Sequence, residues 1–290
     1  MWKHLFRALS PLLVTHALVT AQDIGPKQGA LVIVGGAMKD TAIMERFIDL
    51  AGGPEAPIVI IPTAGSGDHY DQYYPGARRW REAGATNLTV VHTRDRNVAN
   101  TDAFVEPIRK ARGVWFPGGR QWKLADAYLD TRTELELHNL IARGGVIGGS
   151  SAGATIQGSY LVRGDTKTNT IMMGDHEEGF GFLKNVAIDQ HLLARNRHFD
   201  LIPVIEKHPN LLGIGLDEDT AIVVQDDRFE VIGQSVVAIY DHERMLAGEG
   251  RFYFLRPGDS YDMSARQAMR RAFSAEPFDA VREETWPDRN

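Results

Sequence analysis

Short apolar segments alternate with segments of helical periodicity along the first part of the chain, and this alternation limits the folds open to it. The apolar segments cover residues 30–37, 56–64, 87–93, 113–119 and 145–154, and the helical ones cover 41–53, 73–85, 102–111 and 122–144. Strands that are apolar nearly throughout are typical of a parallel sheet with both faces covered. The order therefore predicts an α/β fold with a doubly wound, mostly parallel sheet.

After residue 160 the apolar segments become shorter, and several are expected to be antiparallel additions in the C-terminal half. They cover residues 168–174, 186–191, 211–225, 228–241 and 250–259, with a helix-like segment at 193–209. Residues 264–290 have the pattern of an amphipathic helix followed by a loose end. No linker, repeat or low-complexity tract divides the chain, so residues 22–290 are interpreted as a single domain.

The first 21 residues differ from the rest. Lys3 and Arg7 precede an apolar run, and Val19-Thr20-Ala21 places small residues where a signal peptidase cuts. The alternatives are a frayed terminal segment and a membrane anchor. The run is too short and too interrupted to span a bilayer well, which disfavours the anchor. We expect residues 1–21 to be a signal peptide cut after Ala21, so that the mature protein is secreted or periplasmic and free of the membrane.

Composition and motifs exclude several classes of function. The net charge of -6 disfavours a nucleic-acid-binding protein. The 290 residues contain no cysteine, which excludes a cysteine protease, a thiolate metal site and disulfides. No H-E-x-x-H, G-x-G-x-x-G or P-loop occurs, so neither a catalytic metal nor a nucleotide cofactor is expected.

Three of the predicted strands end in glycine pairs, at residues 35–36, 118–119 and 148–149. Binding sites of open parallel sheets form at the carboxyl ends of strands. One such pair is explained by a tight turn alone. Three pairs at the same edge of the sheet suggest that the backbone approaches a ligand closely.

The segment Gly149-Ser150-Ser151-Ala152-Gly153 is a G-x-S-x-G motif centred on Ser151. Centring it on Ser150 fails, because Ala152 then occupies the second glycine position. Between a strand and a helix the motif predicts a sharp turn that lifts the Ser151 hydroxyl above the sheet, beside backbone N–H groups that can stabilise an oxyanion. The alternative is that both serines only fill a tight turn.

A serine nucleophile needs a base and an acid that orients the base. His191 ends an apolar run in a polar setting, and His198 is a weaker candidate seven residues later. The alternative for His191 is a surface residue at a turn. Asp217, Glu218 and Asp219 lie between two apolar strands, where side-chain alternation leaves open which acid faces the site.

Four ordered motifs, "GGSSAGA", "IDQH" followed by "ARNR", "LLGIGLDEDTAIVV" and "FYFLRPGD", resemble the cyanophycinase-like branch of the S51 serine peptidases, which also includes aspartyl dipeptidases. The resemblance runs from about residue 31 to residue 259. It implies a flavodoxin-like or class I glutamine amidotransferase-like sheet. It also implies a cofactor-independent exopeptidase acting on aspartyl or β-aspartyl peptides, in a family whose members are often homodimers.

By the same resemblance, Ser151 corresponds to the nucleophile, His191 to the general base and Glu218 to the orienting acid. Gly119 and Ala152 correspond to the oxyanion-hole donors. The positions that line the substrate pocket in cyanophycinases correspond to Gln121, Asp189, Gln190, Arg195 and Arg197. The order Ser–His–Glu along the chain argues against an ordinary esterase or lipase, in which the acid precedes the histidine.

One position departs from the family. Cyanophycinases usually have an arginine three residues after the "RNR" motif, where this chain has Asp200. An acid there is expected to change the side-chain subsite while leaving the hydrolytic centre intact. The substrate alternatives are therefore cyanophycin, which is cut to β-Asp-Arg, and another isoaspartyl or aspartyl peptide. A catalytically silent ligand-binding protein on the same scaffold is the alternative from another class.

Overall fold

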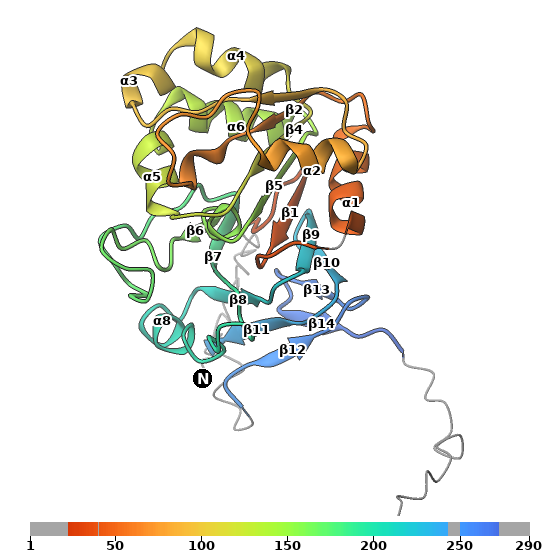
Figure 1. Ribbon diagram of the computed structural model, residues 1–290. Coiled ribbons are helices and arrows are strands. Elements are labelled where there is room, and N and C mark those ends of the chain that lie inside the picture. The colour runs from red at the N-terminus through yellow and green to blue at the C-terminus, as the bar shows by residue number, and fades with distance from the viewer. Residues whose placement is uncertain (1–22, 40, 243–249, 273–290) are drawn as a thin grey trace, which may run out of the picture.

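The computed structural model describes residues 23–39, 41–242 and 250–272, and the predicted signal peptide lies outside them. A nine-stranded sheet forms the centre, with the order β14-β13-β10-β9-β1-β5-β4-β2-β3. Its parallel half consists of β1 (Ala30–Val34), β2 (Ile58–Ile60), β3 (Leu88–Val90), β4 (Gly113–Phe116) and β5 (Val146–Ser150). This arrangement confirms the predicted α/β fold (Figure 1).

The other half of the large sheet is antiparallel and comes from the C-terminal part of the chain. It consists of β9 (Thr220–Gln225), β10 (Arg228–Gly233), β13 (Ser260–Asp262) and β14 (Gln267–Met269). Strand β9 runs antiparallel beside β1, whose other neighbour is β5. Strand β1 is therefore the seam between the two halves, as predicted for antiparallel additions.

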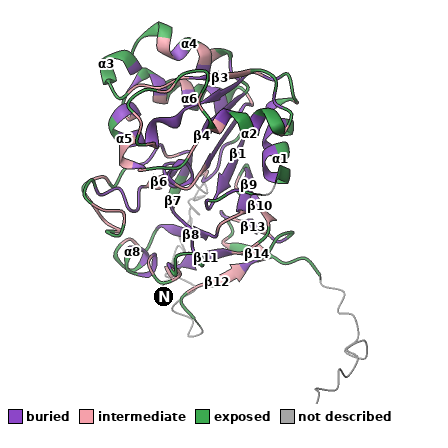
Figure 2. Ribbon diagram, viewed as in Figure 1, coloured by how far each residue is buried: buried purple, intermediate pink, exposed green. Residues whose placement is uncertain are grey.

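Both faces of the large sheet are covered, which explains why its strands read as continuous apolar runs. In β1, Val32 and Val34 pack with α1 (Thr41–Ala51) and α2 (Gly76–Glu82). Leu31 and Ile33 face the opposite side, in a cluster that includes side chains of α4 (Asp102–Lys110), α5 (Trp122–Tyr128) and α6 (Arg132–Ala142). The purple strands between helices with green outer surfaces show the same layering (Figure 2).

A second sheet of five strands lies against the same core. Its order is β12 (Tyr253–Leu255), β11 (Val237–Asp241), β8 (Leu212–Leu216), β7 (Leu183–Gln190) and β6 (Gly158–Tyr160). One face joins the cluster beneath the large sheet through residues such as Ile188 and Ile214. The other face packs with α8 (Ile202–Lys207). That residues 22–290 form a single domain stays a prediction, although one apolar cluster continues through both sheets.

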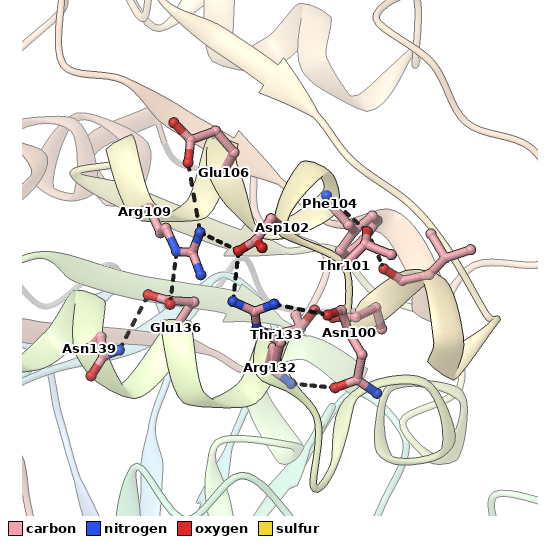
Figure 3. Close-up of polar contacts among 12 residues, drawn as sticks. Asn100, Thr101, Asp102, Phe104, Glu106, Arg109, Arg132, Thr133, Glu136 and Asn139 are labelled. Atoms are coloured by element: carbon pink, nitrogen blue, oxygen red, sulfur yellow. Dashed lines mark hydrogen bonds and ion pairs between the residues drawn. The ribbon is translucent and has the colours of Figure 1, made fainter.

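A network of charged groups connects α4 and α6 at the surface. Asp102 accepts hydrogen bonds from Arg109 at 2.8 Å and from Arg132 at 2.7 Å, and Arg109 also donates to Glu136 at 2.9 Å. Figure 3 shows the two guanidinium groups converging on Asp102 from the two helices. Asp102 is exposed, so solvent screens its two ion pairs, and the buried side chains beneath contribute more to holding the helices together.

The structure corrects four expectations from the sequence. The segment 122–144 is two helices, because Asp130 adopts a left-handed backbone (φ +56°) between α5 and α6. Residues 168–174 form no strand; the Asp165 carboxylate caps the preceding turn by accepting the N–H groups of Lys167 and Thr168.

Two further differences lie in the C-terminal half. Within 193–209 only α8 is helical, because residues 192–200 fold into successive turns. In the described part of 264–290 the chain forms β14 rather than a helix, because pairing with β13 overrides local helical preference. The rest of that prediction falls outside the described residues. Within the described residues, no helix is both long enough and apolar enough to cross a membrane.

Candidate active site

Three strand ends meet beside β1. Ser151 follows β5, His191 follows β7, and Glu218 lies where the chain leaves β8 of the small sheet for β9 of the large one. Val34, the last residue of β1, is paired with Ser150 on one side and with Ala221 on the other. The two sheets thus bring together side chains that are 67 residues apart along the chain.

Ser151 occupies a backbone conformation that is rare for a residue with a side chain, with φ +58° and ψ -113°. Its N–H donates to Val34 O at 3.0 Å, and its carbonyl accepts from the N–H groups of Ala154 and Thr155. Surrounding hydrogen bonds of this kind maintain strained conformations at functional sites. The turn joins β5 to the short helix α7 (Ala152–Thr155) and directs the Ser151 side chain toward His191.

The two glycines of the G-x-S-x-G motif are required because backbone lies against both of them. A Cβ on Gly149 would be 2.2 Å from Gly153 O, and one on Gly153 would be 1.9 Å from Phe116 O. Atoms cannot approach so closely, so either alanine would push β5, β4 or α7 apart. The motif is thus a packing requirement of the turn that presents Ser151.

His191 connects Ser151 to Glu218. Its Nε2 is 2.9 Å from Ser151 Oγ, and its Nδ1 is 2.6 Å from Glu218 Oε1. In the tautomer with a proton on Nδ1, the ring donates to Glu218 and accepts from the Ser151 hydroxyl. The histidine also has a positive φ of +54°, and its N–H donates to Gly35 O at 2.8 Å.

Gly36 makes room for the imidazole. A Cβ at this position would be 2.2 Å from His191 Cε1, so only glycine allows the ring to lie there. A Cβ on Gly35 would meet Asp217 O at 2.1 Å. The sequence suggested that this glycine pair approaches a ligand; the structure places histidine and backbone there instead.

The structure shows which acid faces the histidine. The Asp217 carboxylate accepts the N–H groups of Leu193 and Ala194 at 2.9 and 3.0 Å and the Ser235 hydroxyl at 2.7 Å, which orders the turn after His191. Asp219 accepts the Lys39 N–H. Only Glu218 is directed at the imidazole, because the chain crosses between sheets here and strand alternation does not apply.

Burial and nearby cations lower the pKa of His191. Burial has the largest effect; the hydrogen bond to Glu218 opposes it, and the charge of Arg195 adds to the lowering. A lowered pKa keeps the imidazole neutral near pH 7, which is the form that can accept a proton from serine. The geometry and the charge environment of His191 both suit a general base.

Of the two expected oxyanion-hole residues, Ala152 directly follows Ser151, and Gly119 directly follows Gly118, which approaches Ser151 closely. Ala152 is the first residue of α7, and the first N–H groups of a helix have no acceptor within it. Gly118 passes Ser151 so closely that a Cβ on it would be 3.2 Å from Ser151 Cβ, and Gly119 follows with φ +150°. Gly119 packs on Ala64 O, where a Cβ would come within 2.0 Å.

A cleft of about 420 Å³ opens beside Ser151. It is lined by Ser150, Ser151, His191 and Arg195, and by Ala37, Met38, Met44, Ile60, Tyr74, Gly76, Arg79, Trp80, Trp115, Pro117 and Gly118. Its size is that of a pocket for a small ligand. Most of these lining residues could not have been found from the sequence, because they come from α1, α2 and two strand ends without a shared motif.

Of the five expected substrate-binding residues, only Arg195 lines this cleft. The other four are buried and bonded to protein groups. Gln121 Nε2 donates to Val162 O at 3.0 Å, and Arg197 donates to the carbonyl and the side chain of Gln190 at 3.1 and 3.0 Å. Asp189 is completely buried. These four side chains are bonded to protein partners, and their role toward a substrate stays a prediction.

Arg163 neutralises Asp189 and was not identified from the sequence. Its guanidinium donates to both carboxylate oxygens of Asp189, at 2.7 and 2.9 Å, and to Asp200 at 2.5 Å. Burial alone would lower the pKa of Arg163, but the bonds to the two acids raise it. A single arginine in an unremarkable segment carries no signal of such a contact.

Among the described residues, no group of three or more His, Asp or Glu side chains could hold a metal ion.

Comparisons with known proteins agree on one family. The model of Peptidase family S51 matches residues 31–232. A cyanophycinase of Geminocystis herdmanii (strain PCC 6308) is 32% identical over 268 residues, covering 83% of this chain and 96% of that protein. A cyanophycinase of Nostoc sp. (strain PCC 7120 / SAG 25.82 / UTEX 2576) is 32% identical over 225 residues, covering 73% of each.

A solved structure supports the fold. The crystal structure of a peptidase from an acI-B1 Actinobacterium superimposes with a TM-score of 0.58 at 24% identity, covering 83% of this chain and 98% of that chain.

The lowered pKa of His191 predicts the acid limb of the pH profile. We expect kcat/KM to rise with pH along a limb centred below 6.5, the ordinary value for histidine. Arg195→Gln removes a cation that disfavours imidazolium, so the limb should move to higher pH. The measurement is kcat/KM against pH for both proteins, with Arg228→Gln as a control outside the site. A limb that moves to lower pH in Arg195→Gln contradicts this account of the charges.

The buried pair of Arg163 and Asp189 predicts a large loss of stability when only one partner is removed. Arg163→Met leaves the Asp189 carboxylate buried without a counter-ion and should lower the free energy of unfolding by about 3–5 kcal/mol. Arg228→Met, which breaks the exposed pair with Asp262, should cost less than about 1 kcal/mol. Urea denaturation measures the free energy of unfolding of both variants and of the unaltered protein. Equal losses would show that Asp189 does not depend on its partner.

Proposed function

The chain belongs to peptidase family S51 and is a serine-type peptidase, and we propose that it hydrolyses aspartyl or β-aspartyl peptide bonds with Ser151, His191 and Glu218 as its catalytic triad. The observation that carries the proposal is the continuous path of hydrogen bonds from Ser151 Oγ through the imidazole to Glu218. A catalytically silent binding protein has no need of this path.

The first half of the proposed reaction forms an acyl-enzyme. Ser151 Oγ attacks the peptide carbonyl carbon while His191 Nε2 takes the hydroxyl proton. The N–H groups of Gly119 and Ala152 stabilise the negative charge on the carbonyl oxygen. The C–N bond then breaks, and imidazolium returns the proton to the leaving amine.

The second half releases the acid. Water gives a proton to His191 and attacks the ester carbonyl, and the proton then returns to Ser151 Oγ as the C–O bond breaks. Glu218 retains its charge throughout, holds the ring in the Nδ1–H tautomer and stabilises imidazolium as it forms. The reaction is complete without a cofactor.

The substrate class rests on two supports. The relatives at 32% identity are named cyanophycinase, which makes a polymer of β-linked aspartyl and arginyl residues one candidate. The exposed guanidinium of Arg195 lines the cleft beside Ser151, and a guanidinium binds carboxylates bidentately. Recognition of a free carboxylate next to the scissile bond suits an exopeptidase.

Export is part of the proposal and rests on the sequence of residues 1–21. The charge of Lys3 and Arg7, the apolar run and the small residues before position 22 form a signal-peptide pattern. The proposed mature protein begins at Gln22 and acts outside the cytoplasm as a secreted or periplasmic enzyme.

Replacing the nucleophile tests the proposed chemistry. Ser151→Ala should lower kcat/KM by about 10³–10⁶-fold on whichever substrates the protein cleaves, while its thermal unfolding stays cooperative. The panel consists of insoluble cyanophycin, β-Asp-Arg, β-Asp-Leu and α-Asp-Leu. Ser264→Ala is the matched variant and should retain activity, because Ser264 is exposed, donates to Asp262 and does not line the cleft. Hydrolysis that persists in Ser151→Ala would show that Ser151 is not the nucleophile.

Export is tested by the N-terminus of the protein made from the full-length gene in a bacterial host. Mass spectrometry of the periplasmic or secreted fraction should find Gln22 as the first residue. Ala21→Arg should block cleavage, because signal peptidase requires a small residue there. Full-length protein in the cytoplasm of the unaltered strain would contradict the export proposal without affecting the proposed chemistry.

A further inference from the structure

The cleft beside Ser151 has a largely apolar lining, and it is larger than a single aspartyl group needs. Met38, Met44 and Ile60 line it together with the aromatic residues Tyr74, Trp80 and Trp115. A cleft of about 420 Å³ can hold more than one amino-acid residue. The group joined to the aspartyl residue therefore has this apolar surface available to it.

The charged lining residues of the cleft are both arginines. Arg79 comes from α2 and Arg195 from the turn after His191, and both side chains are exposed. Neither guanidinium forms an ion pair with a carboxylate of the described residues, and none of the lining residues is an acid. The cleft thus presents two positive charges that are not paired with a carboxylate among the described residues.

Acids around the triad already have partners within the protein, as Glu218 has in His191. Asp189 is completely buried in a bidentate pair with Arg163, and Asp200 accepts from the same guanidinium. Asp217 accepts two backbone N–H groups and a hydroxyl. A cationic substrate side chain entering the cleft would meet two arginines and no free carboxylate among these residues.

The aromatic rings offer little compensation by cation–π contact. Trp80 and Trp115 are almost fully buried and pack on each other with ring centroids 4.7 Å apart, and both contact Phe47 edge-on at 5.2 Å. Tyr74 is in an edge contact with Tyr70. These rings are packed against other aromatic rings, and they contribute apolar surface to the lining of the cleft.

We propose that Arg79 and Arg195, set on apolar walls, make the cleft select a carboxylate-bearing peptide with an apolar or aromatic residue joined to the aspartyl group, and reject arginine at that position. The proposal rests on the proposed function for the bond that is cut. It names Arg79 as a residue that determines specificity, because like charges that meet without an intervening acid repel each other strongly in a partly desolvated site.

Four dipeptides separate charge from shape: β-Asp-Leu, β-Asp-Phe, β-Asp-Arg and β-Asp-citrulline, the last being a neutral analogue of the arginine compound. Unaltered protein should cleave β-Asp-Leu and β-Asp-Phe with kcat/KM at least about tenfold above that for β-Asp-Arg. β-Asp-citrulline should also exceed β-Asp-Arg. Equal or faster cleavage of β-Asp-Arg than of β-Asp-Leu overturns the proposal.

Arg79→Glu reverses one of the two charges at an exposed position of α2. It should raise kcat/KM for β-Asp-Arg relative to β-Asp-Leu by about tenfold or more. The matched control is Arg78→Glu, the same charge change on the next residue, which pairs with Glu82 and does not line the cleft. The control should leave the ratio within about twofold, since exposed charges at a distance are screened. Equal shifts in both variants overturn the role of Arg79.

A binding measurement separates failure of this inference from failure of the proposed chemistry. Calorimetry with folded Ser151→Ala protein measures affinity for β-Asp-Leu and β-Asp-Arg without turnover. If no dipeptide is hydrolysed by the unaltered protein but β-Asp-Leu binds the variant more tightly than β-Asp-Arg, the selectivity stands and the reaction assignment fails. If β-Asp-Arg binds equally well or better, or if neither binds, the selectivity proposal is wrong.

Discussion

The close approach of backbone at the ends of β1 and β5 is the constraint on which the site depends. Gly149 and Gly153 allow the turn around Ser151 to close against β4, and Gly36 leaves the volume that the His191 ring fills. Ser151 and His191 themselves adopt positive φ angles, which cost free energy for residues with side chains. The dense hydrogen bonding between β1, β5 and β9 maintains these conformations, so packing of the seam and geometry of the site cannot be varied separately.

A second constraint is the balance of charge around the histidine. Burial disfavours imidazolium, the contact with Glu218 favours it, and the guanidinium groups of Arg195 and Arg197 disfavour it again. Because the net result is a lowered pKa, the resting ring is neutral and ready to accept a proton. Arg195 also lines the cleft beside Ser151, so a substitution at this position changes both the lining of the cleft and the charge around His191.

The sequence predicted the layers and the motif at Ser151 because both follow from local patterns. The apolar runs of β1 and β5 indicate strands that are buried on both faces, and Gly149 and Gly153 indicate close contact between backbone segments. The acid was different. Alternation could not choose Glu218, since the segment between β8 and β9 crosses from one sheet to the other and has no strand geometry. Only the resemblance to a known family pointed to it.

Arg163 shows why the remaining parts could not be predicted. The acid at position 200, where related sequences usually have a base, was expected to reshape the side-chain subsite. In the structure the Asp200 charge is directed at Arg163, which also holds the buried Asp189. The negative charge of Asp200 is thereby paired with Arg163, which lies 37 residues earlier in the chain. The unpaired charges in the cleft are those of Arg195 and of Arg79, and Arg79 lies on α2, outside the motifs at 149–153, 189–197 and 217–219. The net charge of such a site depends on which charged side chains are paired in the folded protein. A single motif position therefore predicts the sign of that charge only when its partner is known.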